Sequence, residues 1–105
     1  MSFLNMLRKD EAIEKIIRYI HGFELAPNWN TWYVGITDDP RQSLYEEHKA
    51  LISKSITVSV DSVATARSVE SFLIARYGMD GTPGDGNNPR YVYAFKKSLN
   101  TDPPL

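Results

Sequence analysis

The chain has 105 residues, enough for one domain with a single hydrophobic core but not for two. With 42% hydrophobic and 24% charged residues, its composition excludes a disordered or fibrous protein. A formal net charge of −1 excludes strong steering of nucleic acid or anionic membrane by overall charge, and the absence of cysteine excludes disulfides and thiolate chemistry. We expect a single domain over residues 1–105, located in the cytoplasm, without a membrane span.

The first predicted elements are an amphipathic helix and a strand. In DEAIEKIIRYIHG, isoleucines recur at helical spacing, Asp10 stands at a position suited to an N-cap, and Gly22 follows the last turn. In TWYVGIT, β-branched and aromatic residues dominate, which predicts a strand. Because side chains alternate along a strand, its two faces carry Trp32, Val34 and Ile36, and Tyr33, Gly35 and Thr37.

A second helix and a second strand are predicted next. Asp39 precedes Pro40, which is typical of an N-cap followed by the first helical position, so DDPRQSLYEEHKALI predicts a helix. Its inward stripe is expected to contain Leu44, His48 and Leu51. SITVSVDS alternates apolar and polar residues and predicts a strand.

The last predicted elements are a third helix, a turn, a strand and a tail. VATARSVESFLIARYG has a helical apolar stripe, with Ser62 or Asp61 as its cap and Gly78 at its end. MDGTPGDGNNP predicts a turn, RYVYAFKK a strand and SLNTDPPL a tail. We therefore expect an α+β fold in the order αβαβαβ, with a small three-stranded mixed or antiparallel sheet flanked by three helices.

Three segments, in this order, resemble the GIY-YIG endonuclease superfamily. Tyr33, Val34 and Gly35 match the second tripeptide of that family, DPRQSLYEEH matches the helix that follows it, and Ala66 with Glu70 matches its glutamate motif. The resemblance covers about positions 32 to 77. It implies a nuclease-like domain that hydrolyses phosphodiester bonds of nucleic acid with Mg²⁺ or Mn²⁺, and DNA is expected as the substrate before RNA.

The resemblance also implies roles for individual side chains. Glu70 would be the metal ligand, because a hard divalent ion prefers oxygen ligands and can be held by one carboxylate together with waters. Tyr33 would orient or deprotonate the attacking water, and His48 would assist proton transfer because histidine titrates near neutrality.

The sequence departs from the family in two places. Ser43 occupies the position of the family's arginine and cannot supply a positively charged guanidinium group to a phosphate. Arg67, one turn before Glu70, is a geometric substitute for that arginine. The first tripeptide is absent before Trp32. We hypothesise that Tyr91 or Tyr93, on the last strand, supplies its tyrosine in a permuted order.

Other interpretations of the same residues stay open. The chain is an active nuclease, or a degenerate copy that binds nucleic acid or a protein partner without cleavage, or a fold with an unrelated ligand. Likewise, Tyr33, Tyr91 and Tyr93 could be ordinary sheet aromatics, His48 a core histidine and Glu70 a surface residue.

Overall fold

The computed structural model describes residues 6–83 and 88–105 and has the predicted α+β architecture. The strands are β1 (Met6–Leu7), β2 (Trp32–Thr37), β3 (Ser55–Val60) and β4 (Tyr91–Lys96), in the spatial order β1-β3-β4-β2. The helices are α1 (Lys9–His21), the π-helical segment η3 (Gln42–Glu47), α2 (Val63–Phe72) and its π-helical continuation η5 (Leu73–Tyr77). Short 3₁₀ turns, η2 (Trp29–Thr31) and η4 (Ile52–Lys54), precede β2 and β3.

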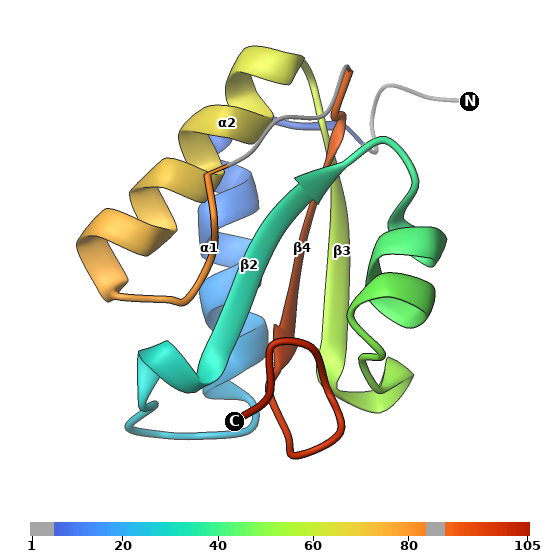
Figure 1. The fold of residues 1–105 in the computed structure, drawn as a ribbon. Coiled ribbons are helices and arrows are strands. Elements are labelled where there is room, and N and C mark those ends of the chain that lie inside the picture. Colours follow the sequence, from blue (N-terminus) through green and yellow to red (C-terminus); the bar gives the residue numbers. More distant parts are fainter. Residues whose placement is uncertain (1–5, 84–87) are drawn as a thin grey trace.

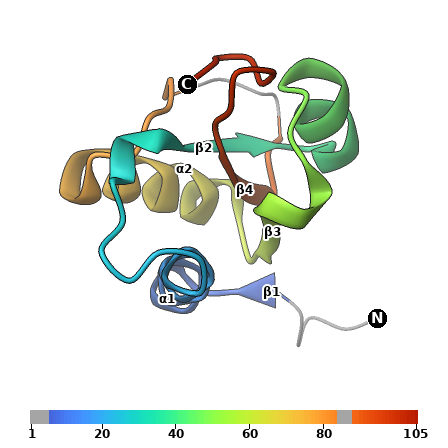
Figure 2. The same cartoon turned by 90° about the horizontal axis from the view of Figure 1, so that it is seen from below.

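The sheet is flanked on both faces. Figures 1 and 2 show α1 and α2 on one face, and η3 together with the C-terminal segment on the other. β4 lies between β2 and β3 and is antiparallel to both, whereas β1 runs parallel to β3. In the part of the chain that the structure describes, no helix is long and apolar enough to cross a bilayer.

The expectation of three strands is wrong by one, because β1 adds a fourth strand at the edge of the sheet. β1 contains only two residues, Met6 and Leu7, which pair with Ser59 and Val60. A segment of this length shows no alternation of apolar and polar residues, so the sequence pattern does not reveal it. The predicted turn after η5 includes residues 84–87, which lie outside the described residues.

The helix ends follow local hydrogen bonding. The Gln42 N–H donates to Asp39 Oδ1 at 3.2 Å, and the Thr65 N–H donates to Ser62 Oγ at 3.0 Å, so these two predicted caps are confirmed. Helix α1 begins two residues earlier than expected, at Lys9, and its cap is Arg8 rather than Asp10. Gly78 ends η5 with φ 78°, in the left-handed region that favours glycine.

The main core lies between the sheet and helices α1 and α2. Alternation along the strands is as predicted, since one face of β2 packs against the helices while the other faces η3. The buried side chains shared by sheet and helices are Ala12, Ile16, Ile20, Trp32, Val34, Val58, Val60, Ala66, Val69, Leu73, Met79, Val92 and Ala94. This core fixes the orientation of α2 relative to β2 and β4.

The middle helix differs from the expected α-helix. The His48 N–H donates to the Ser43 carbonyl at 2.9 Å, five residues back, which is the π-helical pattern. The segment ends at Glu47, and Leu51, expected on the inward stripe, is 56% exposed. Leu44 is buried as predicted. The early end places His48 at the C-cap, beside the sheet rather than along a continuing helix.

Glu24, which follows α1, connects this part of the chain to β4. Lys96 Nζ lies 2.6 Å from Glu24 Oε2, and the Trp32 Nε1–H donates to Glu24 Oε1 at 3.2 Å. The hydrogen bond from Lys96 lowers the pKa of Glu24, and burial opposes this effect. Since the folded-state pKa is depressed, the interaction stabilises the fold above the unfolded pKa, and this stabilisation is lost as the pH falls through the folded pKa.

Glu24→Gln is therefore expected to lower the free energy of unfolding by about 1 kcal/mol near neutral pH and by much less at about pH 3. Chemical denaturation at both pH values measures this difference. Glu14→Gln is a suitable control, because it breaks the exposed ion pair with Arg18 and should change stability less. An equal loss for Glu24→Gln at the two pH values would contradict the assignment.

Candidate functional site

An aromatic and imidazole cluster lies on the face of the sheet opposite α1 and α2. It consists of Tyr33, His48, Tyr93 and Phe95, and we call it the Tyr93 cluster. The strand register explains it, because Tyr33 pairs with Phe95 and Gly35 pairs with Tyr93 across β2 and β4. Directly opposed residues share a face, so the alternation of two strands gathers three aromatic rings there.

His48 packs among these rings from the end of η3. Its ring centroid lies 4.7 Å from that of Tyr33, 5.1 Å from that of Phe95 and 5.6 Å from that of Tyr93. Its Nδ1 lies 2.6 Å from the Asp102 carbonyl oxygen, and its Nε2 lies 2.8 Å from Tyr93 Oη. The structure therefore brings together three residues that the sequence singled out.

The hydrogen bonds fix which nitrogen of neutral His48 carries the proton. A carbonyl oxygen only accepts, so Nδ1–H must donate to Asp102. The Nε2 atom then carries a lone pair and accepts from the Tyr93 hydroxyl. The result is a directed chain from the Tyr93 phenol through the imidazole to a main-chain carbonyl.

Gly35 makes room for the Tyr93 ring. A Cβ atom at this position would lie 2.3 Å from Tyr93 Oη and 2.4 Å from its Cζ. The glycine of the Tyr33–Val34–Gly35 tripeptide thus has a steric role in this chain, because the phenol of Tyr93 lies directly over its α-carbon. Any side chain here would displace that phenol from the imidazole.

Both phenols of the cluster remain protonated at neutral pH. Burial raises the pKa of Tyr93 well above its ordinary value, and the charges of Tyr33 and Glu70 add to this effect. Burial also raises the pKa of Tyr33, while hydrogen bonding with Thr82 opposes the rise. At neutral pH each phenol is therefore a hydrogen-bond donor and not a deprotonated base.

We expect Tyr33 and Tyr93 to ionise only as the protein unfolds at alkaline pH. Because their folded-state pKa values are raised, they contribute stability below the ordinary tyrosine value of 10.0 that is lost as the pH rises further. Ultraviolet absorbance of tyrosinate and circular dichroism, followed in one titration, measure both events. Ionisation of these two phenols well before loss of structure, assigned with Tyr33→Phe and Tyr93→Phe, would refute this.

Glu70 is a buried carboxylate whose charge acts on the two phenols. It lies on α2 with 2% of its surface exposed, so the interpretation as a surface residue is wrong. Its negative charge contributes to the raised pKa of both Tyr33 and Tyr93. Within residues 6–83 and 88–105 there is no group of three or more histidine, cysteine or acidic side chains that could hold a metal ion. A single carboxylate such as that of Glu70 fits only a Mg²⁺-type site completed by water and substrate phosphate.

The other candidate residues, Ser43, Tyr91 and Arg67, are not members of this cluster. The Ser43 hydroxyl donates to Thr37 Oγ1 at 2.8 Å, and both side chains are buried. Tyr91 pairs with Thr37 and Ser59, two residues along β4 from Tyr93. Arg67 lies on α2 and is exposed. Of the two tyrosines on the last strand, Tyr93 is therefore the one that contacts both Tyr33 and His48.

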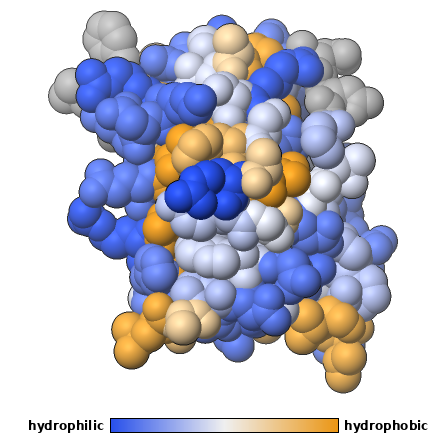
Figure 3. All heavy atoms as spheres, turned by 90° about the vertical axis from the view of Figure 1, so that its left-hand side faces the viewer, coloured by the Kyte–Doolittle hydropathy of each residue, from blue (hydrophilic) through white to orange (hydrophobic). Residues whose placement is uncertain are grey.

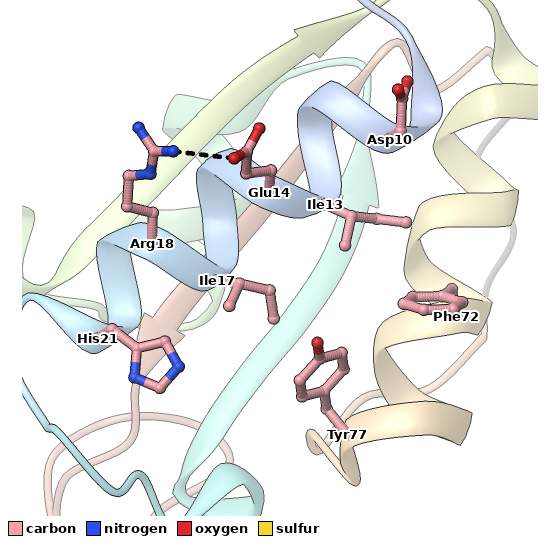
Figure 4. Close-up of a pocket in the computed structure, with 8 residues that line it drawn as sticks. All are labelled: Asp10, Ile13, Glu14, Ile17, Arg18, His21, Phe72 and Tyr77. Carbon is pink, nitrogen blue, oxygen red and sulfur yellow. Dashed lines mark hydrogen bonds and ion pairs between the residues drawn. The ribbon is translucent and has the colours of Figure 1, made fainter.

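A separate groove lies between α1 and the end of α2. Its volume is about 570 Å³, and Figure 4 shows Ile13 and Ile17 facing Phe72 and Tyr77 across it. The remaining lining residues are Asp10, Glu14, Arg18 and His21. Figure 3 shows apolar surface at the centre of this side of the molecule, bordered by hydrophilic residues. Since the groove and the Tyr93 cluster lie on opposite faces of the sheet, they are distinct sites.

Two contributors to the Tyr93 cluster were missed in the sequence. Asp102 acts through its main-chain carbonyl, and Thr82 forms hydrogen bonds with Tyr33. A main-chain atom leaves no residue-type signal, although the Asn, Thr, Asp and Pro residues of SLNTDPPL are typical of a structured turn.

Comparisons with models of protein families, with curated proteins and with solved structures gave no match. The geometry of the Tyr93 cluster is therefore the basis for a functional proposal.

Proposed function

We propose that this chain is a GIY-YIG-like, metal-dependent phosphodiesterase acting on nucleic acid, with its chemistry at the Tyr93 cluster. The observation that carries the proposal is the hydrogen bond from Tyr93 Oη to His48 Nε2 at 2.8 Å. The negative charge of buried Glu70 helps to raise the pKa of the same phenol. A phenol that donates to an oriented imidazole is a proton-transfer pair, and such pairs are typical of hydrolytic sites.

In the proposed reaction, Tyr93 takes a proton from the attacking water while it gives its own proton to His48 Nε2. The water oxygen forms a bond to phosphorus as the bond to the leaving oxygen breaks, and the leaving oxygen keeps the bonding electron pair and takes a proton from solvent. Since the raised pKa of Tyr93 disfavours a free phenolate, the two proton transfers occur together. The imidazolium that results is stabilised by the Asp102 carbonyl, which accepts from Nδ1–H.

Tyr33 and Glu70 have supporting roles in this scheme. The Tyr33 ring packs against His48 and, with Phe95, limits the orientations of the imidazole. Glu70 would hold Mg²⁺ or Mn²⁺, which when bound supplies Lewis-acid stabilisation of negative charge on the phosphate. DNA is the expected substrate before RNA, as the resemblance implies.

A second candidate function is binding without cleavage, and Ser43 favours it. At the position where the family has its arginine, this serine is 8% exposed and donates to Thr37. The side chain is therefore turned into the protein and supplies no positive charge to a phosphate. Loss of such a group commonly costs a hundredfold or more in rate, so the same fold would then be a nucleic-acid-binding or protein-binding module.

Incubation with supercoiled plasmid and with structured RNA, in Mg²⁺, Mn²⁺ or a chelator, separates the two functions. The phosphodiesterase proposal expects cleavage by the wild-type protein that the chelator abolishes. Cleavage that appears only in Ser43→Arg would identify an inactivated descendant. If neither protein cleaves any substrate while both remain folded, the phosphodiesterase proposal fails, and binding of labelled DNA and RNA should then be measured.

A further inference from the structure

The C-terminal segment after β4 forms a closed turn around Thr101. The Ser98 N–H donates to Thr101 Oγ1 at 2.9 Å, and the Thr101 hydroxyl lies within hydrogen-bond distance of the carbonyl oxygens of Ser98 and Pro103, at 3.0 and 2.9 Å. The Leu105 N–H also donates to the Ser98 carbonyl at 2.9 Å. Thr101 is 5% exposed, so one buried hydroxyl connects both ends of this turn.

The turn places the backbone of Asp102 against both the main chain and the ring of His48. The Asp102 N–H donates to the His48 carbonyl at 2.9 Å, and the Asp102 carbonyl accepts from His48 Nδ1–H at 2.6 Å. These residues lie 54 positions apart in the chain. Figure 2 shows the C-terminal segment on the same face of the sheet as η3. His48 is therefore held at its main chain and at its ring by one neighbouring residue.

We propose that Thr101 is a positioning residue for His48, and that the C-terminal turn belongs to the site because it orients this imidazole. Thr101 fixes the turn, the turn fixes the Asp102 carbonyl, and the carbonyl keeps the proton of neutral His48 on Nδ1. Only then does Nε2 offer a lone pair to Tyr93. The role of this turn in cleavage rests on the proposed phosphodiesterase function, whereas its effect on the imidazole does not.

Three variants separate this role from the alternatives. Thr101→Val keeps the side-chain shape and removes the hydroxyl, and Thr101→Ser restores a hydroxyl. Asp102→Ala is the matched control, because the interaction with His48 uses only main-chain atoms and the Asp102 side chain is exposed. If the Asp102 carboxylate were the true partner, Asp102→Ala would act like Thr101→Val.

The readout is the tautomer ratio of neutral His48, obtained from the nitrogen chemical shifts of its ring by nuclear magnetic resonance. We expect the Nδ1–H form in the wild type, a shift of the ratio toward Nε2–H by about tenfold in Thr101→Val, and recovery in Thr101→Ser. Faster hydrogen exchange of the Asp102 N–H in Thr101→Val should accompany the shift. An unchanged ratio in Thr101→Val, or a changed ratio in Asp102→Ala, would overturn the proposal.

Cleavage is measured on the same variants so that the two proposals can fail separately. Thr101→Val should lower the rate of plasmid cleavage about tenfold, in proportion to the change in tautomer ratio. If the wild type cleaves nothing but the ratio still shifts, the positioning role holds and the phosphodiesterase function fails. If the wild type cleaves and the ratio does not shift, the positioning role fails alone.

Discussion

Tyr93→Phe is expected to lower the rate of metal-dependent plasmid cleavage about 100-fold. The substitution removes the hydroxyl that donates to His48 Nε2 at 2.8 Å and leaves the ring in place over Gly35. The water then loses its proton acceptor, while packing of the Tyr93 cluster is preserved. Single-turnover cleavage assays measure the effect, and thermal unfolding verifies that the variant is folded.

Tyr91→Phe is the matched comparison for this prediction. Tyr91 lies two residues away on the same strand and the same face, but it pairs with Thr37 rather than Gly35. We expect its removal to leave the rate close to that of the wild type. If Tyr91→Phe abolished cleavage and Tyr93→Phe did not, the roles that we assign to the two tyrosines would be reversed.

Gly35→Ala is expected to lower the free energy of unfolding by about 2–3 kcal/mol, a large effect for one added methyl group. The new Cβ would meet Tyr93 Oη at 2.3 Å and Cζ at 2.4 Å, so the ring or the strand must move. The displaced phenol would also lose its hydrogen bond to His48. Chemical denaturation gives the stability change, and the cleavage assay should show a loss comparable to that of Tyr93→Phe.

A double-mutant cycle tests whether the Tyr93 ring is the cause. In Tyr93→Leu the ring that obstructs the new methyl group is gone, so adding Gly35→Ala to this variant should cost much less stability than adding it to the wild type. Equal costs in both backgrounds would show that the strain arises elsewhere on β2. The cycle needs only stability measurements and is therefore independent of catalysis.

Much of the fold was readable from periodicity and capping residues. Isoleucines at helical spacing predicted α1, and alternation predicted β2, β3 and β4 close to their observed bounds. Asp39 and Ser62 marked two helix starts because their side chains bond the first free N–H groups. The two-residue β1 and the π-helical form of η3 were not readable, since both depend on tertiary contacts rather than on local preference.

The candidate site was predicted in part, through residue types. Tyr33, His48 and Tyr93 were singled out, and they are in contact. Choosing Tyr93 over Tyr91 required the register of β4 against β2, which a sequence does not specify. The role of Asp102 could not be anticipated because a carbonyl oxygen belongs to every residue. The burial of Glu70 depends on how α2 packs, and the sequence alone was compatible with either a buried or an exposed side chain.

The most direct test of the phosphodiesterase proposal is the rate of plasmid cleavage in Mn²⁺ by Glu70→Gln, relative to the wild type and to Glu46→Gln. The Glu46 control removes the same charge from an exposed position on η3. We expect folded Glu70→Gln to cleave at least about 100-fold more slowly than the wild type, and Glu46→Gln to cleave normally. Equal rates for Glu70→Gln and the wild type would contradict a catalytic centre at the Tyr93 cluster.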